Sequence, residues 1–375
     1  MKYYIIAGET SGDLHGSHLV RELAMTSPGA RFRGNGGDLM AAEGVEIVQH
    51  IRDLDFMGFW EILVNLRRIL SYLKNCKQDI AQWKPDAIIL IDYPGFNLRM
   101  AEFAKKMGVP VFYYVSPQLW AWKQGRIRKI KKYVDHMFVI LPFEKDFYAR
   151  FHYEVDFVGH PLLDAMPALP TMDGDTFREQ YGLDQRPIIA LLPGSRKQEI
   201  RRILPVMLSV VPFFNHAFQF VIAGTSAVPK DFYDKISRGT QIPVVVGETY
   251  TLMKHAEAAL ITSGTATLEA ALLDLPQVVC YKANPISYFI ARKLVHLNYI
   301  SLVNLILEKE VVKELIQSEM NDTTVAFQLN EIVFNNEKRE QIFSDYVELR
   351  RKLGGKGASK LVAGLIVRYL NQASP

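Results

Sequence analysis

Short apolar runs alternate with longer helix-compatible stretches along the whole chain, and this alternation constrains the fold more than any other feature. The runs are rich in β-branched and aromatic residues and occur at 3–7, 87–92, 111–115, 137–141, 155–158, 188–192, 218–223, 243–246, 258–261 and 277–281. Strands that alternate with helices are typical of right-handed βαβ units and parallel sheets. Most runs are apolar on both faces, as expected for strands that helices cover on each side. The sequence therefore predicts an α/β fold.

The series of strands begins again in the second half of the chain. A length of 375 residues favours two or three domains, because an ordinary domain has roughly 150 residues. A proline-rich, polar segment between Gly159 and Pro187 separates the two series, and we place the boundary there, with domains at 1–165 and 166–355. Each domain is expected to be a doubly wound, Rossmann-like sheet. Two such sheets facing across a cleft would hold ligands beyond the carboxyl ends of their strands.

Cysteine usage, the N-terminus and the charge pattern narrow the class of protein. The only cysteines, Cys76 and Cys280, lack metal-ligand or redox spacing, so a reducing compartment fits best. No signal-peptide pattern follows Met1, and prolines and polar residues interrupt the uncharged stretch 203–229, which predicts a helix and a strand rather than a membrane span. The run 123–132 holds six basic residues and no acid, and is either a solvated helix face or a contact for phosphate. We predict a cytoplasmic protein without a nucleic-acid partner.

The first loop that can carry chemistry, 7–16, follows the first strand directly. Its glycines lie four residues apart, which is not the G-x-G-x-x-G fingerprint, so a nicotinamide-dependent dehydrogenase is not supported. A plain strand-to-helix turn is the simplest interpretation. The presence of Glu9, Asp13 and His15 in one short loop favours a functional interpretation instead.

Asp92 stands at the end of another apolar strand. An acid at the carboxyl edge of a buried parallel strand points into the ligand-binding region, and its carboxylate can take a proton from a sugar hydroxyl as general base. Capping the next helix is an equally good interpretation. Trp120 and Trp122 follow a third strand, where they either pack in the core or form a stacking wall for a sugar or an acyl chain.

Two loops of the second domain are suited to phosphate. In the first, Gly194 lets the backbone approach a ligand, Ser195 can cap the next helix, and Arg196 supplies a guanidinium fork that matches phosphate. The loop is not a P-loop, because Gly-Lys-Ser/Thr is absent. We expect it to be the pyrophosphate site of the domain.

The second of these loops runs from residue 262 to residue 270. Its small residues, which offer backbone and hydroxyl donors to phosphate, are Ser263, Gly264, Thr265 and Thr267. Glu269 falls inside the following helix, where it either accepts from ribose hydroxyls or interacts favourably with the helix dipole. The two loops together predict a nucleotide-sugar site in the C-terminal domain.

Seven motifs follow one another from residue 7 to about residue 306. They are Ala-Gly-Glu-Thr-Ser-Gly-Asp at 7–13, Tyr-Val-Ser-Pro-Gln-Leu-Trp-Ala-Trp at 114–122, Leu-Pro-Phe-Glu-Lys-Asp-Phe-Tyr at 141–148, Phe-Val-Gly-His-Pro at 157–161, Leu-Leu-Pro-Gly-Ser-Arg at 191–196, Ser-Gly-Thr-Ala-Thr-Leu-Glu at 263–269 and Ser-Leu-Val-Asn-Leu-Ile at 301–306. In this order they resemble the lipid-A-disaccharide synthases, which are inverting glycosyltransferases of Gram-negative bacteria.

The resemblance implies a GT-B architecture in which the last segment, about 356–375, returns to the first domain. It implies that UDP-2,3-diacylglucosamine donates its sugar to 2,3-diacylglucosamine 1-phosphate, which gives a β(1→6)-linked disaccharide and UDP. By the same analogy, Arg196, Glu269 and Asn304 contact the UDP moiety. Because both substrates are acylated, the enzyme is expected to work at the inner-membrane surface as a peripheral protein. The stretch 56–70 is either its membrane contact or a core helix at a domain interface.

One position departs from the family pattern. Many members carry an acid after the proline of the loop that contains Asp92, and this acid is a proposed catalytic residue, whereas here the position is Gly95. The catalytic base is then Asp92, which we favour, or a group of the first loop: Glu9, Asp13 or His15. Arg196 and two helix N-termini would stabilise the departing pyrophosphate, so we expect neither a metal nor a cofactor.

Two other functions stay open at this point. A UDP-sugar 2-epimerase shares the two-domain architecture but needs no lipid acceptor, so the hydrophobic and basic surface of the first domain argues against it. A non-catalytic protein that binds a nucleotide sugar or a lipid is favoured only by Gly95. A homodimer is a further open prediction.

Overall fold

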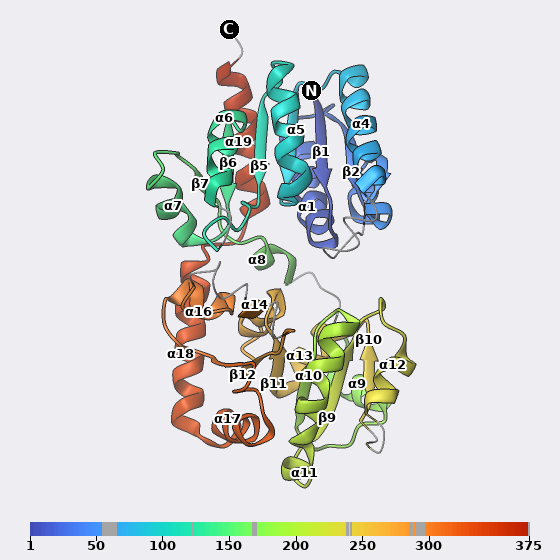
Figure 1. Cartoon of the computed structure of the whole chain (residues 1–375), viewed down its shortest axis with the longest axis vertical. Helices are drawn as coiled ribbons and strands as arrows, with labels where there is room; N and C mark the ends of the chain where they lie inside the picture. The colour runs from blue at the N-terminus through green and yellow to red at the C-terminus, as the bar shows by residue number, and fades with distance from the viewer. Residues whose placement is uncertain are drawn as a thin grey trace. The chain divides into compact units, whose positions relative to one another are not determined.

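The computed structural model describes residues 1–54, 66–121, 124–166, 171–237, 240, 242–284, 288–289 and 297–373. The chain forms two compact units. Unit 1 contains residues 1–164 and 353–375, and unit 2 contains residues 165–352. Figure 1 shows that the blue N-terminal and red C-terminal segments belong to the same unit. Each unit is built on one parallel sheet.

Unit 1 has a seven-stranded sheet in the order β3-β2-β1-β4-β5-β6-β7. Its strands are β1 (Lys2–Ala7), β2 (Arg31–Gly36), β3 (Val45–His50), β4 (Ala87–Ile91), β5 (Val111–Tyr114), β6 (His136–Val139) and β7 (Asp156–Phe157). β1 pairs in parallel with β2 on one side and with β4 on the other. The strand order therefore reverses between β1 and β4, and such a switch point is where open α/β sheets bind ligands.

Helices on both faces cover this sheet. Its helical segments are α1 (Thr10–Thr26), α2 (Asp38–Ala42), η1 (Ile51–Leu54), α4 (Leu66–Trp83), α5 (Pro94–Lys106), η2 (Gln124–Arg126), α6 (Ile127–Tyr133), α7 (Pro142–Ala149), α8 (Leu162–Ala165), which ends at the unit boundary, and α19 (Ala358–Ala373). The layer of α4, α5 and α6 shares a core with alternate strand residues such as Tyr4, Ile6 and Leu90. α1 packs against α2 and α19.

The segment that returns from unit 2 is fixed in unit 1 by its backbone and by α19. The His160 amide donates to the Leu353 carbonyl oxygen at 3.0 Å. Gly354 has a φ of +88°, and a Cβ there would lie 3.1 Å from the Gly159 Cα. The segments around Gly159 and Gly354 therefore approach so closely that a side chain at position 354 would be strained. At the far end, the Tyr369 ring of α19 stacks on the His136 ring with centroids 3.7 Å apart.

Unit 2 has a six-stranded sheet in the order β10-β9-β8-β11-β12-β13. Its strands are β8 (Ile188–Leu192), β9 (Gln219–Gly224), β10 (Val244–Val246), β11 (Ala256–Thr262), β12 (Gln277–Tyr281) and β13 (Lys313–Ile316). Its helices are α9 (Gly174–Tyr181), α10 (Lys197–Ser209), α11 (Val211–Phe214), α12 (Lys230–Ile236), α13 (Thr249–His255), α14 (Thr265–Leu272), α16 (Leu302–Leu307), α17 (Asp322–Phe334) and α18 (Asn336–Lys352). The switch point of this sheet lies between β8 and β11.

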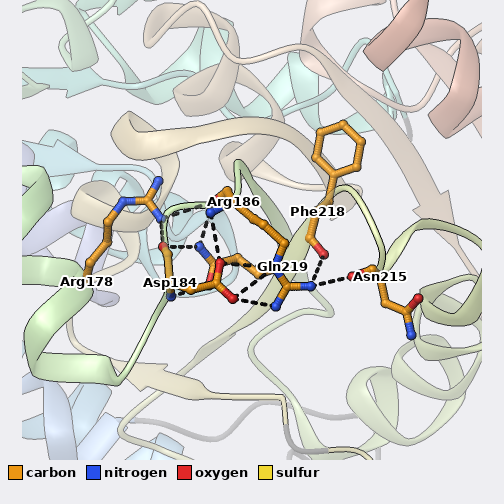
Figure 2. Close-up of polar contacts among 6 residues, drawn as sticks. All are labelled: Arg178, Asp184, Arg186, Asn215, Phe218 and Gln219. Carbon is orange, nitrogen blue, oxygen red and sulfur yellow. Dashed lines mark hydrogen bonds and ion pairs between the residues drawn. The ribbon is translucent and has the colours of Figure 1, made fainter.

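A polar network closes the amino end of this second sheet, away from the carboxyl edge of its strands (Figure 2). The Gln219 side-chain amide donates to the carbonyl oxygens of Asp184 and Arg186 at 2.8 and 2.6 Å. The Arg186 guanidinium pairs with the Asp184 carboxylate and donates to the carbonyl oxygen of Asn215. The network ties the turn before β8 to the start of β9, which explains a buried glutamine at the first position of an otherwise apolar strand.

Each predicted strand is present, with ends within a few residues of the predicted ones. The strands β2, β3 and β13 were not predicted. β2 contains Arg31 and Arg33, and β13 contains Lys313 and Glu314, so neither has the continuous apolar pattern that we used. The stretch 203–229 forms the end of α10, then α11 and β9. Among the residues that the structure describes, no helix is long and apolar enough to cross a membrane.

Candidate active site

Glu9 and Asp92 follow neighbouring strands at the switch point of unit 1. Glu9 comes two residues after the end of β1, and Asp92 comes directly after β4. Both side chains are half-buried. A Cβ at Gly8 would lie 2.4 Å from the ring of Tyr93, so the sequence needs glycine here for the two loops to approach each other.

The backbone at Asp92 is strained and clamped. Asp92 and Tyr93 have φ values of +43° and +48°, a conformation that costs roughly 1–3 kcal/mol for a residue other than glycine. The Asp92 carbonyl oxygen accepts hydrogen bonds from the Tyr113 hydroxyl at 2.5 Å and from the Asn97 amide at 2.7 Å. Asn97 also donates to the carbonyl oxygen of Ile91 at 3.1 Å. These bonds fix the direction in which the Asp92 carboxylate leaves the sheet.

The environment of Asp92 suits a general base. Its pKa is raised to about 7, first by burial and then by the negative charge of Glu9, against a backbone hydrogen bond at Tyr93 that lowers it. A carboxyl group with a pKa near the operating pH takes up a proton with the greatest efficiency. The same structure shows that Gly95 is exposed, and that a Cβ there would meet no atom within 4 Å.

Asp13 has a structural role, and its part in catalysis stays a prediction. It is 3% exposed. Its carboxylate accepts hydrogen bonds from the backbone amides of Gly37 at 2.7 Å and of Leu39 and Met40 at 3.1 Å. Both oxygens are thereby engaged at the start of α2. Asp13 therefore caps α2.

His15 is also buried, on the side of α1 that faces Tyr114, with ring centroids 6.5 Å apart. Burial and the neighbouring His18 lower the pKa of His15 to about 4. Its Nδ1 has no hydrogen-bond partner in the described part of the chain. The neutral ring packs inside unit 1, so exchange of a proton with a substrate is unfavourable at this position.

The tryptophan loop is at least partly structural. Glu144 is buried, accepts from the backbone amides of Ile140 and Leu141 at 3.2 and 3.0 Å, and accepts from the indole N–H of Trp120 at 3.3 Å. Trp120 packs edge-on against Phe143 and against the core. The core interpretation of Trp120 is therefore correct, whereas the prediction for Trp122 lies outside the described residues.

In unit 2, the first phosphate-type loop lies at the switch point after β8. Gly194 has a φ of +109°, and a Cβ there would lie 2.7 Å from a carboxylate oxygen of Glu199. Ser195 is exposed, but the N-cap residue of α10 is Arg196, and no side chain caps that helix. The prediction that Ser195 caps α10 is wrong. The Arg196 guanidinium lies 3.3 Å from Glu199, and both groups are partly exposed.

The second phosphate-type loop follows β11, the other strand of the switch point. Gly264 and Thr265 are exposed at the start of α14. The Ser263 hydroxyl donates to the carbonyl oxygen of Ile300 at 2.9 Å, and the buried Thr267 hydroxyl donates to that of Gly264 at 2.8 Å. The hydroxyls of Ser263 and Thr267 thus shape the loop, while the amides of Gly264 and Thr265 stand at the accessible helix start.

Glu269 lies on α14 and is held by a partner that the sequence did not indicate. Its carboxylate accepts from the Tyr250 hydroxyl at 3.0 Å. Burial raises the pKa of Glu269, and the Tyr250 hydrogen bond opposes this shift. One carboxylate oxygen is fixed by Tyr250, so the group is oriented before any ligand arrives.

Asn304 is held in a buried hydrogen-bond network, and its contact with UDP stays a prediction. It is fully buried. Its amide nitrogen donates to the Val312 carbonyl oxygen at 2.8 Å and to Glu314 at 2.9 Å, and its oxygen accepts from the amides of Val311 and Val312 at 2.8 and 3.0 Å. All its usual hydrogen bonds are made inside the protein.

Glu314 extends this buried network to the second phosphate-type loop. Its carboxylate accepts from the backbone amides of Ile300 and Ser301, both at 2.9 Å. Ile300 in turn holds Ser263. The motif around Asn304 therefore helps to position the loop after β11. Among the residues that the structure describes, no group of acids, histidines and cysteines could hold a metal ion.

Solved structures share this fold. The UDP-GlcNAc 2-epimerase of Neisseria meningitidis, bound to UDP-GlcNAc, aligns with a TM-score of 0.68 at 16% identity over 98% of this chain and 100% of its own. The calicheamicin glycosyltransferase CalG4 aligns with a TM-score of 0.63 at 16% identity over 100% of this chain and 99% of its own. Two Rossmann-like units with these neighbours define a GT-B-like protein, as predicted.

Sequence comparison shows the family. The family model for lipid-A-disaccharide synthetase matches residues 3–366. The lipid-A-disaccharide synthase of Syntrophus aciditrophicus is 41% identical over 98% of each chain, and those of Trichlorobacter lovleyi and Myxococcus xanthus are each 38% identical over 98% of this chain and 97% of theirs. The chain belongs to the lipid-A-disaccharide synthase family and is a glycosyltransferase. The predicted family and enzyme class are confirmed, and the likeness to epimerases is one of fold alone.

Proposed function

We propose that this enzyme transfers the sugar of UDP-2,3-diacylglucosamine to 2,3-diacylglucosamine 1-phosphate, giving the β(1→6)-linked disaccharide 1-phosphate and UDP. Membership of the family supports a nucleotide-sugar donor and a lipid-sugar acceptor. The observation that carries the chemistry is the clamped Asp92 carboxyl at the switch point of unit 1, with its pKa raised to about 7.

In the proposed mechanism, the Asp92 carboxylate takes the proton of the acceptor 6-hydroxyl. The resulting oxygen nucleophile attacks the anomeric carbon of the donor from the face opposite UDP, so the C–O bond to UDP breaks while the new glycosidic bond forms and the configuration inverts. The negative charge of Glu9 raises the basicity of Asp92. A positioned base of this kind contributes roughly 10²–10⁴-fold to the rate.

Unit 2 supplies the donor side in this proposal. Charge grows on the departing diphosphate, which we assign to the start of α10 with Arg196 and to the start of α14 with Gly264 and Thr265. Glu199 lies near Arg196 and would give up part of this contact when the stronger anion binds. Glu269, oriented by Tyr250, is assigned to the ribose hydroxyls.

The direct test is incubation of the purified chain with both acylated glucosamines, with the product followed by mass spectrometry. We expect the disaccharide 1-phosphate and an equal amount of UDP. The Arg196→Ala variant should bind UDP more weakly and turn over at least about 100-fold more slowly, while near-normal turnover would refute its role. Conversion of a soluble UDP-sugar alone would instead support a UDP-sugar 2-epimerase.

We also propose that unit 1 meets the cytoplasmic face of the inner membrane as a peripheral protein. A groove of about 510 Å³ lies between α4 and α5. Its apolar lining includes Leu73 and Phe103. Its basic lining residues are Lys74, Lys77, Arg99 and Lys106. Cations beside apolar surface suit anionic lipid headgroups. Of the predicted contact 56–70, residues 56–65 and the side chains of 66–69 lie outside the described residues.

Co-sedimentation with vesicles containing phosphatidylglycerol tests this contact. The Lys74→Glu/Lys77→Glu variant should lose most of its binding. The Lys230→Glu/Lys360→Glu variant changes the net charge equally at exposed positions outside the groove and should keep it. Equal loss in both variants would show non-specific charge attraction. The homodimer also stays a prediction, which sedimentation velocity can test.

A further inference from the structure

A second pocket, of about 670 Å³, lies in unit 2 beyond the carboxyl ends of β12 and β13. Its lining comes from four parts of the unit: Arg202 of α10, Lys282 and Ala283 after β12, the rings of Tyr288 and Phe289, and Gln317 and Ser318 after β13. The volume falls in the range of roughly 300–1,000 Å³ that small-molecule sites occupy. Its position at the carboxyl edge of a parallel sheet is where such folds bind ligands.

Gln317 builds the rim of this pocket. Its φ is +55°, an uncommon conformation for a residue other than glycine. Its backbone amide donates to the Tyr281 carbonyl oxygen at 2.8 Å, and its side-chain oxygen accepts from the Ala283 amide at 3.1 Å. The ends of the two strands are thereby joined, so the rim is formed without a ligand.

The chemistry of the lining fits an amphiphile. The wall is largely apolar and contains the two aromatic rings. Arg202 and Lys282 are half-buried, and the described residues that line the pocket include no acid. An apolar wall with two cations at its side matches a molecule that joins a hydrocarbon chain to an anionic head.

The pocket borders the loop that we assign to the donor diphosphate. Arg202 belongs to α10, the helix that begins directly after Arg196. Glu199, in the first turn of α10, acts electrostatically on Tyr281, which directly precedes Lys282. A ligand whose phosphates lie at the start of α10 can therefore extend into the pocket without leaving unit 2.

We propose that this pocket binds an acyl chain of the nucleotide-sugar donor, with Tyr288 and Phe289 lining the hydrocarbon and Arg202 and Lys282 facing the polar part of the same molecule. The inference rests on the proposed function and adds to it a residue set that selects the donor by its acyl chain. The pocket then discriminates between acylated and non-acylated UDP-sugars, whereas the loops after β8 and β11 bind the nucleotide common to both.

The test compares wild type with Phe289→Ser on UDP-glucosamine donors that carry short, medium and long acyl chains. In wild type, kcat/KM should rise with the length of the donor chain. In Phe289→Ser the rise should flatten, with a loss of about tenfold or more for the longest chain. The Kd of UDP alone, measured by calorimetry, should not change, because UDP does not reach the pocket.

Phe213→Ser is the matched control, since Phe213 is 60% exposed and Phe289 is 59% exposed, and Phe213 does not line the pocket. It should behave as wild type. An unchanged dependence on donor chain length in Phe289→Ser, an equal loss of UDP affinity, or an altered dependence on the acceptor chain instead would each overturn the inference. If wild type forms no disaccharide at all, the proposed function fails, whereas the difference in Kd between UDP and acylated UDP-glucosamine still tests the pocket.

Discussion

The side-chain amide of Asn97 donates a hydrogen bond of 2.7 Å to the backbone carbonyl oxygen of Asp92. Asn97 lies in the first turn of α5 and Asp92 at the end of β4, so one residue joins the helix to the strained turn that carries the acid. A strained backbone persists only where its surroundings hold it. The position of the Asp92 carboxylate therefore depends on a neighbour that need not touch a substrate.

Replacing Asn97 by alanine tests this dependence. Asn97→Ala removes the side-chain donor to the Ile91 carbonyl oxygen and one of the two donors to the Asp92 carbonyl oxygen, and leaves only the Tyr113 hydroxyl at Asp92. We expect kcat to fall by about 100-fold with a nearly unchanged KM, because a misplaced catalytic group is costly. The free energy of unfolding should fall by about 1–3 kcal/mol. A folded variant with full kcat would show that the clamp does not position the base.

Gly95→Asp restores the acid that many family members carry. The position is exposed and has open space for a side chain, and it lies in the first turn of α5, where an acid is stabilising by roughly 0.3–1 kcal/mol. If Asp92 is the base, kcat of this variant should stay within about tenfold of wild type. The double variant Asp92→Asn/Gly95→Asp should remain inactive in the same disaccharide assay. Recovery of activity by the double variant would assign the proton to position 95.

Asn304→Ala separates a structural role from ligand contact. The change leaves two backbone amides and the Glu314 carboxylate without their buried partner. We expect the free energy of unfolding, measured by urea denaturation, to fall by about 2–3 kcal/mol. UDP affinity of the folded fraction should change much less than in Arg196→Ala. Unchanged stability with lost UDP affinity would identify Asn304 as a direct contact of UDP.

His15 and His160 should make the protein sensitive to acid. Burial lowers the pKa of His15 to about 4 and that of His160 to about 3, whereas an unfolded histidine has a pKa of about 6.5. Below pH 6.5 the unfolded state binds more protons, so the stability that these rings contribute is present above pH 6.5 and is lost as the pH falls towards 4. Each contributes a slope of at most about 1.4 kcal/mol per pH unit.

The raised pKa values of Asp92 and Glu144, both about 7, act in the opposite direction between about pH 4 and 7. The useful measurement is therefore the difference between wild type and His15→Asn in the pH dependence of unfolding. Wild type should lose more stability on acidification than the variant. Parallel curves would mean that His15 is not buried as a neutral ring.

The sequence predicted the strands that are apolar on both faces and the loops that follow them. A strand that is buried on both faces has a continuous run of apolar residues, which is visible in the sequence. It did not predict β2 or β13, whose charged residues hide that pattern. It could not separate Asp92 from Asp13, since both are acids that follow a strand closely in the sequence. The difference comes from three backbone amides at the start of α2, and the sequence does not show which segments fold together.

The same limit applies to the second unit. The sequence does not show whether an asparagine is buried or exposed, and only the structure reveals that Asn304 bonds with Val311, Val312 and Glu314. Gly194 was predictable, because its loop follows an apolar strand and needs a positive φ. The sequence did not indicate a role for Tyr250 or Glu199. Their roles follow from side-chain contacts with Glu269 and Arg196, which only the structure shows.

The central claim is that Asp92 is the base and that Glu9 raises its pKa, and the pH dependence of kcat/KM for Glu9→Gln tests it most directly. In wild type, activity should rise with pH through an apparent pKa of about 7, as Asp92 loses its proton. Removing the negative charge of Glu9 lowers the pKa of Asp92, so the acid limb of Glu9→Gln should shift to lower pH, while Asp92→Asn should lose about 10²–10⁴-fold in rate. An acid limb that stays in place or moves to higher pH in Glu9→Gln would contradict the account.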